Sequence, residues 1–366
     1  MRIGTVTFWD TQDNYGQVLQ CYALIHFLKS LGHEAFLIKH SLYKESRKEL
    51  LTKTIKSLVS PRTIYNKLVN INQILTSKKD TTQHPRYFDD FRKKYIPSTP
   101  MIYDYAQLVE KPPVADVYVC GSDQIWRNLN PIYYLQFGSQ QTKRIAYAPS
   151  TGGKIFGSSD KKVLKKYLSD FDFLSSREVS GTDLLHELGF DKAAVVPDPT
   201  MLLKVSDFRE LEDKKQKHEK PYLLVYLLGG KTDLKIERIY EFANKLNLQV
   251  KYIASQGRND SFPKIYPTIE EWLELIDHAS YFITNSFHGT VFSLFFNTPF
   301  MTLPLTGNYS SMNDRIFGLL KKADLMDRVF NGSLDTITDP INFDVFEKKK
   351  SEDVERIKDI FASILV

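Results

Sequence analysis

The sequence has few cysteines and no long apolar run. Its 366 residues include only two cysteines, Cys21 and Cys120, both in apolar stretches and without metal-ligand spacing. So few cysteines are typical of a chain that folds in a reducing compartment without disulfides. No apolar run approaches the roughly 18 residues that span a bilayer, and residues 1–6 indicate a strand rather than a signal peptide. These features predict a cytoplasmic protein.

Motifs of several common enzyme classes are also missing. The sequence has no Walker A phosphate loop, no Gly-x-Gly-x-x-Gly after a strand, no Gly-x-Ser-x-Gly and no His-Glu-x-x-His. Its eight histidines are scattered along the chain. We therefore predict no metal site.

The positive charge is concentrated in one segment. Residues 42–82 carry nine Lys or Arg against three Asp or Glu, although the whole chain has a formal charge of only +5. The remaining residues are therefore slightly acidic, which argues against a nucleic-acid-binding surface. Two apolar stripes at helical spacing predict that residues 42–82 form a basic helical insertion. The insertion either forms a solvated lid or makes a peripheral contact with the inner face of an anionic membrane.

Strands and helices alternate on both sides of this insertion. Residues 3–8 and 35–38 indicate strands, and the apolar spacing between them indicates a helix that stops at Gly32. Such a unit predicts parallel strands with a right-handed crossover. Further strands are predicted at 116–120, 144–148, 171–175, 193–196, 222–228, 249–254, 281–284 and 300–303, and helices at 161–168, 181–188, 232–246, 268–278, 290–296 and 351–364.

This order predicts an α/β protein of two Rossmann-like parallel-sheet domains that face a cleft, as in the GT-B architecture. The charged, apolar-poor residues 204–221 are predicted to be a linker. The predicted domains are therefore 1–203 and 222–350, and a helix at 351–366 packs back on the body. Because ligands in open α/β sheets bind beside the carboxyl ends of the strands, the loops there hold the candidate site residues.

The first candidate loop, residues 13–17 (Asp-Asn-Tyr-Gly-Gln), opens the first helix. Its N–H groups could attract an anion, and Gly16 permits a close approach. Alternatively, Asn14 only caps the helix.

The second candidate loop, residues 121–126 (Gly-Ser-Asp-Gln-Ile-Trp), follows a strand. Asp123 either accepts a hydroxyl proton or caps a helix. Trp126 either stacks on a sugar ring or belongs to the core.

The third candidate loop, residues 175–178 (Ser-Ser-Arg-Glu), follows the strand predicted at 171–175 and contains an arginine. Arg177 is placed to hold a carboxylate or phosphate with two hydrogen bonds, and the alternative is an ion pair with the adjacent Glu178.

The fourth candidate loop, residues 284–290 (Thr-Asn-Ser-Phe-His-Gly-Thr), lies at a strand-to-helix turn. His288 can donate or accept a proton near neutral pH, and Gly289 lets an anion approach the helix. His288 could instead be structural, and Ser286 and Thr290 could be ordinary helix caps.

These segments together resemble the polysaccharide pyruvyl transferase family. The resemblance runs from residue 1 to about residue 325 and omits the insertion and the C-terminal tail. It rests on the four loops and on two further motifs, residues 146–150 (Ala-Tyr-Ala-Pro-Ser) and residues 196–200 (Val-Pro-Asp-Pro-Thr). Six motifs in the same order make the resemblance specific.

The resemblance implies a GT-B-like fold and a transfer of pyruvate from phosphoenolpyruvate to a sugar diol of a surface polysaccharide or its lipid-linked precursor. Members often carry Arg-Leu-His where this chain has Ser286-Phe287-His288, with the histidine catalytic and the arginine bound to the donor. This chain lacks that arginine, and Arg315 is our candidate replacement. The resemblance implies no metal ion and no cofactor besides the donor substrate.

The expected roles follow from this resemblance. His288 and Asp123 are expected to be catalytic, and the second domain is expected to carry most of the donor site. The donor-binding candidates are Arg177, Arg315, Ser286, Gly289 and Thr290, and the acceptor-binding candidates are Asn14, Tyr15, Gly16, Gln124 and Trp126.

Two other functions fit the sequence. A GT-B glycosyltransferase would share the architecture but use a nucleotide sugar. A carbohydrate-binding relative without activity would explain the serine at position 286, although the presence of His288 and Arg177 argues against it.

Overall fold

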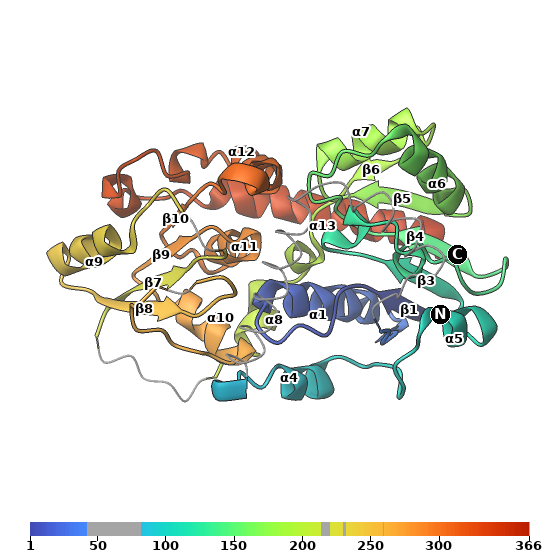
Figure 1. Cartoon of the computed structure of the whole chain (residues 1–366), viewed down its shortest axis with the longest axis horizontal. Helices are drawn as coiled ribbons and strands as arrows, with labels where there is room; N and C mark the ends of the chain where they lie inside the picture. Colours follow the sequence, from blue (N-terminus) through green and yellow to red (C-terminus); the bar gives the residue numbers. More distant parts are fainter. Residues whose placement is uncertain (42–81, 214–219, 230–231, 259, 366) are drawn as a thin grey trace, which may run out of the picture.

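The computed structural model describes residues 1–41, 82–213, 220–229, 232–258 and 260–365. The predicted insertion therefore lies outside the described residues, apart from its last residue. In the described part, two parallel sheets lie side by side (Figure 1). This confirms the predicted fold class.

The first sheet has six strands in the order β2-β1-β3-β4-β5-β6. Register is parallel throughout, with Ile3 opposite both Ala35 and Val117. Each strand is short, and all but the edge strand β6 are mostly buried, as expected for a parallel sheet covered by helices on both faces. The strands are β1 (Arg2–Val6), β2 (Glu34–Leu37), β3 (Val117–Cys120), β4 (Lys143–Ala146), β5 (Phe173–Ser176) and β6 (Ala194–Val195).

The second sheet has four parallel strands in the order β10-β9-β7-β8. Its central strand β7 (Tyr222–Tyr226) is buried along its whole length and pairs with β8 (Gln249–Ile253) and β9 (Tyr281–Thr284). Strand β10 (Phe300–Thr302) completes the sheet. Every strand predicted from the sequence is present, within a few residues of its predicted ends.

Helix α1 (Tyr15–Ser30) shows how local sequence signals fix an element. The Asn14 side chain accepts a hydrogen bond from the Gln17 N–H, which satisfies one of the donors left open at a helix start. The helix ends before Gly32, whose φ of +86° is accessible to a glycine at low cost. Twelve of its residues are buried, so α1 lies inside the molecule rather than on its surface.

The other helices cover the sheets and join the two halves. Helix α8 (Val205–Arg209) lies within the segment predicted to be a linker, and its Phe208 is fully buried. The remaining α-helices are α4 (Phe88–Tyr95), α5 (Tyr105–Glu110), α6 (Ser158–Leu168), α7 (Val179–Glu187), α9 (Ile236–Lys245), α10 (Ile269–Asp277), α11 (Phe287–Phe296), α12 (Asp314–Lys322) and α13 (Asp344–Ile364). The 3₁₀ helices are η1 (Gln124–Arg127), η2 (Pro131–Tyr134), η3 (Pro199–Leu202), η4 (Gly307–Asn313), η5 (Met326–Arg328) and η6 (Asp335–Thr338).

One hydrophobic core continues from the first half into the second. Tyr15 of α1 stacks on Trp272 of α10 with ring centroids 5.1 Å apart, and its hydroxyl donates to the Pro267 carbonyl at 2.7 Å. Helix α13 runs across both halves (Figure 1), and Phe361 near its end packs on Phe27 of α1. In the described residues, no helix combines the length and the apolar character needed to cross a membrane.

Candidate functional site

Polar side chains that follow three strands of the first sheet come together. Asp123 follows β3, Arg177 follows β5 and Asp198 follows β6. In a parallel sheet these carboxyl ends lie on one edge, which explains why residues so far apart in sequence meet. Asp123 and Arg177, both predicted as site residues, are thus brought into one group.

Arg177 is the centre of this group. Its Nη1 donates to Asp198 Oδ2 at 2.6 Å, its Nε donates to Glu178 Oε1 at 3.0 Å, and its Nη2 lies 3.8 Å from Asp123 Oδ1. Burial alone would lower the pKa of the guanidinium, but the surrounding carboxylates Glu178, Asp198 and Asp123 raise it. Nη2 is buried and has no hydrogen-bond partner among the described residues. Arg177 therefore forms the ion pair with Glu178 and still has one hydrogen-bond donor, Nη2, without a described partner.

Asp198 is fully buried and its carboxylate is held on both oxygens. Oδ1 accepts from the Thr200 N–H at 3.1 Å and from the Thr200 hydroxyl at 2.8 Å. Oδ2 accepts from Ser122 Oγ at 3.1 Å as well as from Arg177. Burial alone would raise the pKa of Asp198, but the interactions with His288 and Arg177 lower it well below its usual range. The carboxylate is therefore ionised at neutral pH.

His288 reaches this carboxylate from the other half of the molecule. It lies in the first turn of α11, whose N-cap Ser286 accepts a hydrogen bond from the Gly289 N–H at 3.2 Å. His288 Nε2 lies 3.6 Å from Asp198 Oδ2, too far for a hydrogen bond but close enough for a strong electrostatic interaction. The histidine–carboxylate pair therefore forms only where the two halves meet.

Gly16 makes room for the histidine. A Cβ atom on Gly16 would lie only 2.1 Å from His288 Nδ1, a distance that no side chain can tolerate. The imidazole ring is thus in close contact with the first turn of α1. The glycine predicted to permit a close approach does so, but the group that approaches it in this structure is His288.

Arg315 is the second arginine beside the pair. Its guanidinium carbon lies 5.7 Å from the Phe287 ring centroid, and that of Arg177 lies 4.7 Å from the same centroid. When the amide of Gln124 is oriented with its oxygen toward Arg315, both guanidinium NH₂ groups donate to that oxygen at 3.0 Å. Burial and the nearby charge of Arg177 lower the pKa of Arg315 to about 10, so it remains a cation at neutral pH.

Both arginines line a pocket between the two halves. The pocket has a volume of about 540 Å³ and is bounded by the start of α7, by η3, by α12 and by α13. Asp198 and Phe287 also line it, and lysines 321 and 322 lie in its α12 wall. The cavity can therefore admit a small anion to both arginines.

Asp123 has an unusual backbone. Its φ of 68° and ψ of −176° lie in a region that residues with a Cβ rarely adopt, at a cost of roughly 1–3 kcal/mol. Its Oδ2 lies 3.4 Å from Gln17 Nε2 at the start of α1. Asp123 is thus held between Arg177 and the helix that contacts His288.

Several predicted ligand-binding residues have structural roles instead. Tyr15 is completely buried in the aromatic cluster with Trp272, and Trp126 is buried, stacks on Tyr134 and donates its N–H to the Tyr133 carbonyl. These contacts favour the core interpretation of Trp126 and leave neither ring face open to a sugar. Asn14 acts as a helix cap, as the alternative interpretation proposed.

The same holds for two residues of the histidine loop. The Thr290 hydroxyl is buried, donates to the Ser286 carbonyl at 3.1 Å and bonds the Thr302 hydroxyl at 2.9 Å. A Cβ on Gly289 would lie 2.6 Å from Thr284 Oγ1, so this glycine is needed for packing of α11 on β9. Of the fourth candidate loop, His288 alone makes a described ion-pair contact with the carboxylates of the first half.

Asp198 and Phe287 were not predicted from the sequence as site residues. Asp198 follows strand β6 closely, and the rule that selected Asp123 and Arg177 also applies to it. The proline that follows Asp198 indicates a turn instead. Phe287 gave no signal in the sequence, since its contacts depend on two arginines from different halves.

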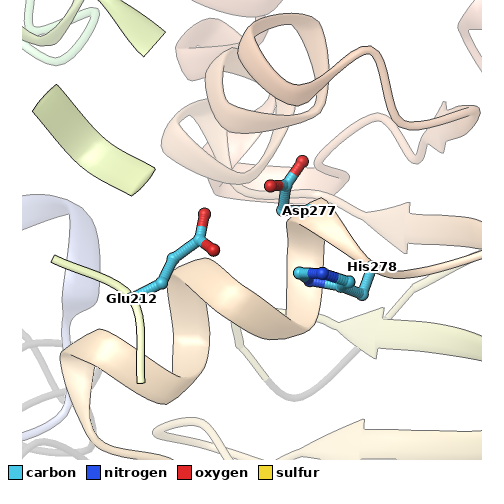
Figure 2. Close-up of side chains that lie close together, drawn as sticks. All are labelled: Glu212, Asp277 and His278. Atoms are coloured by element: carbon cyan, nitrogen blue, oxygen red, sulfur yellow. The ribbon is translucent and has the colours of Figure 1, made fainter. Parts of the chain in front are cut away.

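A group of potential metal ligands lies elsewhere. Ligand atoms of Glu212, Asp277 and His278 lie within 4.8 Å of one another at the end of α10 (Figure 2). Asp277 already forms a two-bonded ion pair with Arg209 at 2.8 and 2.9 Å. The group has no residue in common with the pocket, and we assign no metal to it.

Comparisons with known proteins agree with this architecture. A sequence model of the polysaccharide pyruvyl transferase family matches residues 14–305. A comparison with curated proteins finds no match. A UDP-GlcNAc 2-epimerase from Methanocaldococcus jannaschii has a similar fold, with a TM-score of 0.51, 11% identity, and coverage of 97% of this chain and 92% of that one.

Two further solved structures are less similar. A UDP-GlcNAc 2-epimerase from Neisseria meningitidis, bound to UDP-GlcNAc, gives a TM-score of 0.49 at 9% identity and covers 100% of this chain and 99% of its own. A glycosyltransferase from Streptomyces sp. SF2575 gives a TM-score of 0.36 at 11% identity, with coverage of 99% and 96%. At such low identity the structural similarity concerns the fold and not the substrate.

Proposed function

This chain belongs to the polysaccharide pyruvyl transferase family, and we propose that it transfers pyruvate from phosphoenolpyruvate to a sugar diol of a surface polysaccharide or its lipid-linked precursor. The observation that carries the proposal is the position of Arg315. It lies on the wall of the pocket that Arg177 and Asp198 also line, and it makes no ion pair among the described residues. The histidine–carboxylate pair lies directly beside this pocket.

The charges around Arg177 and Arg315 explain why the two arginines have different roles in the proposal. Three carboxylates surround Arg177, so this residue alone cannot make the site attractive to an anion. Arg315 adds the positive charge that is needed, and Nη2 of Arg177 adds one available hydrogen-bond donor. Each hydrogen bond to a charged group contributes about 1.5–3 kcal/mol. In our proposal Arg315 replaces the family arginine that is absent at Ser286.

The proposed reaction is an addition to an enol phosphate, followed by displacement of phosphate. Protonation of the methylene carbon of phosphoenolpyruvate makes the neighbouring carbon electrophilic, and a sugar hydroxyl attacks it. A second hydroxyl then closes the ketal as the carbon–oxygen bond to phosphate breaks. One of the two hydroxyl protons replaces the proton that was added to the methylene carbon, and the other leaves with the phosphate. No metal ion or other cofactor is needed for this balance.

The roles of the residues follow from their positions. His288 transfers the protons, and general acid–base catalysis of this kind is worth roughly a hundredfold to ten-thousandfold in rate. Asp123 orients the acceptor hydroxyl from the neighbouring strand end, with Gln17 and Gly16 on the same side. Gln124 contacts Arg315 and lies at the border of the donor and acceptor regions.

Calorimetric titration with phosphoenolpyruvate tests the proposal and requires no knowledge of the acceptor. We expect saturable binding that Arg315→Met weakens, with Arg238→Met, an exposed arginine of α9, as the matched control. Binding of UDP sugars without binding of phosphoenolpyruvate would replace the proposal with a glycosyltransferase. The absence of binding by either compound would favour a carbohydrate-binding protein without activity.

A further inference from the structure

His288 lies between two groups of opposite polarity. On one side is the buried carboxylate of Asp198, 3.6 Å from Nε2. On the other side is the N-terminal turn of α1, which contacts Nδ1 through Gly16. The two ring nitrogens of a neutral histidine are not equivalent, since one carries the proton and the other the lone pair. The surroundings of the ring therefore decide which nitrogen can act as a base.

Both neighbours favour the same arrangement. A lone pair on Nε2 would face a carboxylate that is ionised and fixed by Thr200 and Ser122, which is repulsive, whereas an N–H there is attracted. A helix N-terminus carries about half a positive charge, so it disfavours a proton on Nδ1. Helix α1 has 16 residues, enough to develop this dipole. The proton is thus favoured on Nε2 and the lone pair on Nδ1.

We propose that Asp198 is a positioning residue that fixes the tautomer of His288, and that Nδ1, beside Gly16, is the nitrogen that exchanges protons with the substrates. The identity of these substrates rests on the proposed function, but the tautomer does not. Nε2 is buried and has no hydrogen-bond partner among the described residues, and a side-chain shift of a few tenths of an ångström would bring it within bonding distance of Asp198 Oδ2. Catalytic hydrogen bonds are often long before the substrate binds.

The His288–Asp198 pair also explains the roles of residues that do not take part in the reaction itself. Ser122 and Thr200 hold the carboxylate in place, and Gly16 provides the space that Nδ1 occupies. In this proposal the acceptor hydroxyl meets Nδ1 near the start of α1, where Asp123 accepts a hydrogen bond from Gln17.

Nitrogen NMR of the full chain with ¹⁵N-labelled histidine tests the tautomer without any substrate. His288→Gln identifies the signals of His288, and the exposed histidines of the same chain serve as references. For the neutral ring we expect a proton on Nε2 alone, in slower exchange with solvent than in the references because Nε2 is buried. A proton on Nδ1, a doubly protonated ring, or a signal like those of the exposed histidines would overturn the inference.

Variants separate positioning from simple stability. We expect Asp198→Asn to remove the preference for a proton on Nε2 and to reduce kcat by a hundredfold or more, with less than a threefold change in the dissociation constant of phosphoenolpyruvate. Asp260→Asn, which alters a partly buried carboxylate paired with Lys264, is the control. It should change neither the His288 signal nor kcat. An unchanged His288 signal in folded Asp198→Asn would overturn the role of Asp198.

Ser122→Ala keeps the carboxylate and loosens its support, so it remains informative if Asp198→Asn does not fold. We expect a smaller loss of kcat, about tenfold, together with faster exchange of the Nε2 proton, and unchanged exchange would count against the inference. If phosphoenolpyruvate does not bind the wild-type chain but the tautomer is as expected, the proposed function fails and the inference about Asp198 stands.

Discussion

The two halves of the molecule present their charged site residues in different ways. In the first half Arg177 is surrounded by Asp198, Glu178 and Asp123, and its charge is compensated several times. In the second half Arg315 has only a side-chain amide and a backbone carbonyl as partners among the described residues. Buried charges that compensate one another form a rigid support, whereas a cation without an acidic partner can bind an incoming anion.

The difference also suggests how the site is assembled. The first half provides a network whose charges are paired before a ligand arrives, with Nη2 of Arg177 as its unpartnered donor among the described residues. The second half adds His288 Nε2, which also has no described partner, and the cation of Arg315. A continuous core with Tyr15 and Trp272 at its centre fixes the halves relative to each other. The comparison therefore predicts different consequences for mutations of the two arginines.

The largest expected effect is on stability, from the first half. Arg177→Met leaves three carboxylates close together without their cation. Those of Asp198 and Glu178 are almost completely buried. Breaking a buried ion pair by removal of one partner costs about 3–5 kcal/mol. We expect a loss of this size in the free energy of unfolding, measured by urea denaturation. If Arg177→Met unfolds at the same urea concentration as the wild type, the network around Arg177 does not stabilise the first half.

The next effect is on donor binding, from the second half. Arg315→Met removes a cation that has no acidic partner among the described residues, so its loss leaves no carboxylate uncompensated at bonding distance. We expect the dissociation constant for phosphoenolpyruvate to rise about tenfold to a hundredfold, which corresponds to the roughly 1.5–3 kcal/mol of a charged hydrogen bond.

Urea denaturation of the same variant provides the second readout. We expect a stability change below about 1 kcal/mol, as for substitutions outside buried networks. Arg315→Lys should restore part of the affinity, since it keeps the charge but not the two-nitrogen fork. Equal losses of stability in both arginine variants would remove the distinction between the halves.

The sequence was sufficient to predict most of the fold. All ten strands could be predicted because each is a short apolar run bounded by polar or turn-forming residues. Helices α4, α5 and α12 were not predicted, since α4 and α5 are short and α4 and α12 are rich in charge. Phe208 made the segment at 205–209 part of the core although its composition indicated a linker.

The site was predictable only where it depends on one strand. The positions of Asp123, Arg177 and His288 after strands indicated that they lie at sheet edges. The contact of Gly16 with His288 and that of Gln124 with Arg315 depend on how the two halves pack, which no local pattern encodes. For the same reason Tyr15 and Trp126 looked like ligand contacts but are buried by elements outside their own loops.

A pH effect tests the network of the first half in a different way. The folded pKa of Asp198 lies below the unfolded value of about 3.9, so its stabilisation is complete above that value and is lost as the pH falls below it. One such group contributes a slope of about 1.4 kcal/mol per pH unit. We expect the stability difference between wild type and Asp198→Asn to shrink from pH 5 to pH 3. A constant difference would mean that Asp198 does not carry the charge of the network.

The smallest effect comes from making the second half resemble the first. Gln124→Glu gives Arg315 a carboxylate partner at the position where the amide oxygen now accepts two hydrogen bonds at 3.0 Å. Because the donor must compete with the new carboxylate, we expect its dissociation constant to rise about twofold to fivefold, with a slight gain in stability. Gln124→Met removes the amide without adding charge and should leave binding unchanged or slightly tighter. If Gln124→Glu binds phosphoenolpyruvate as well as the wild type does, Arg315 is not the residue that binds the donor.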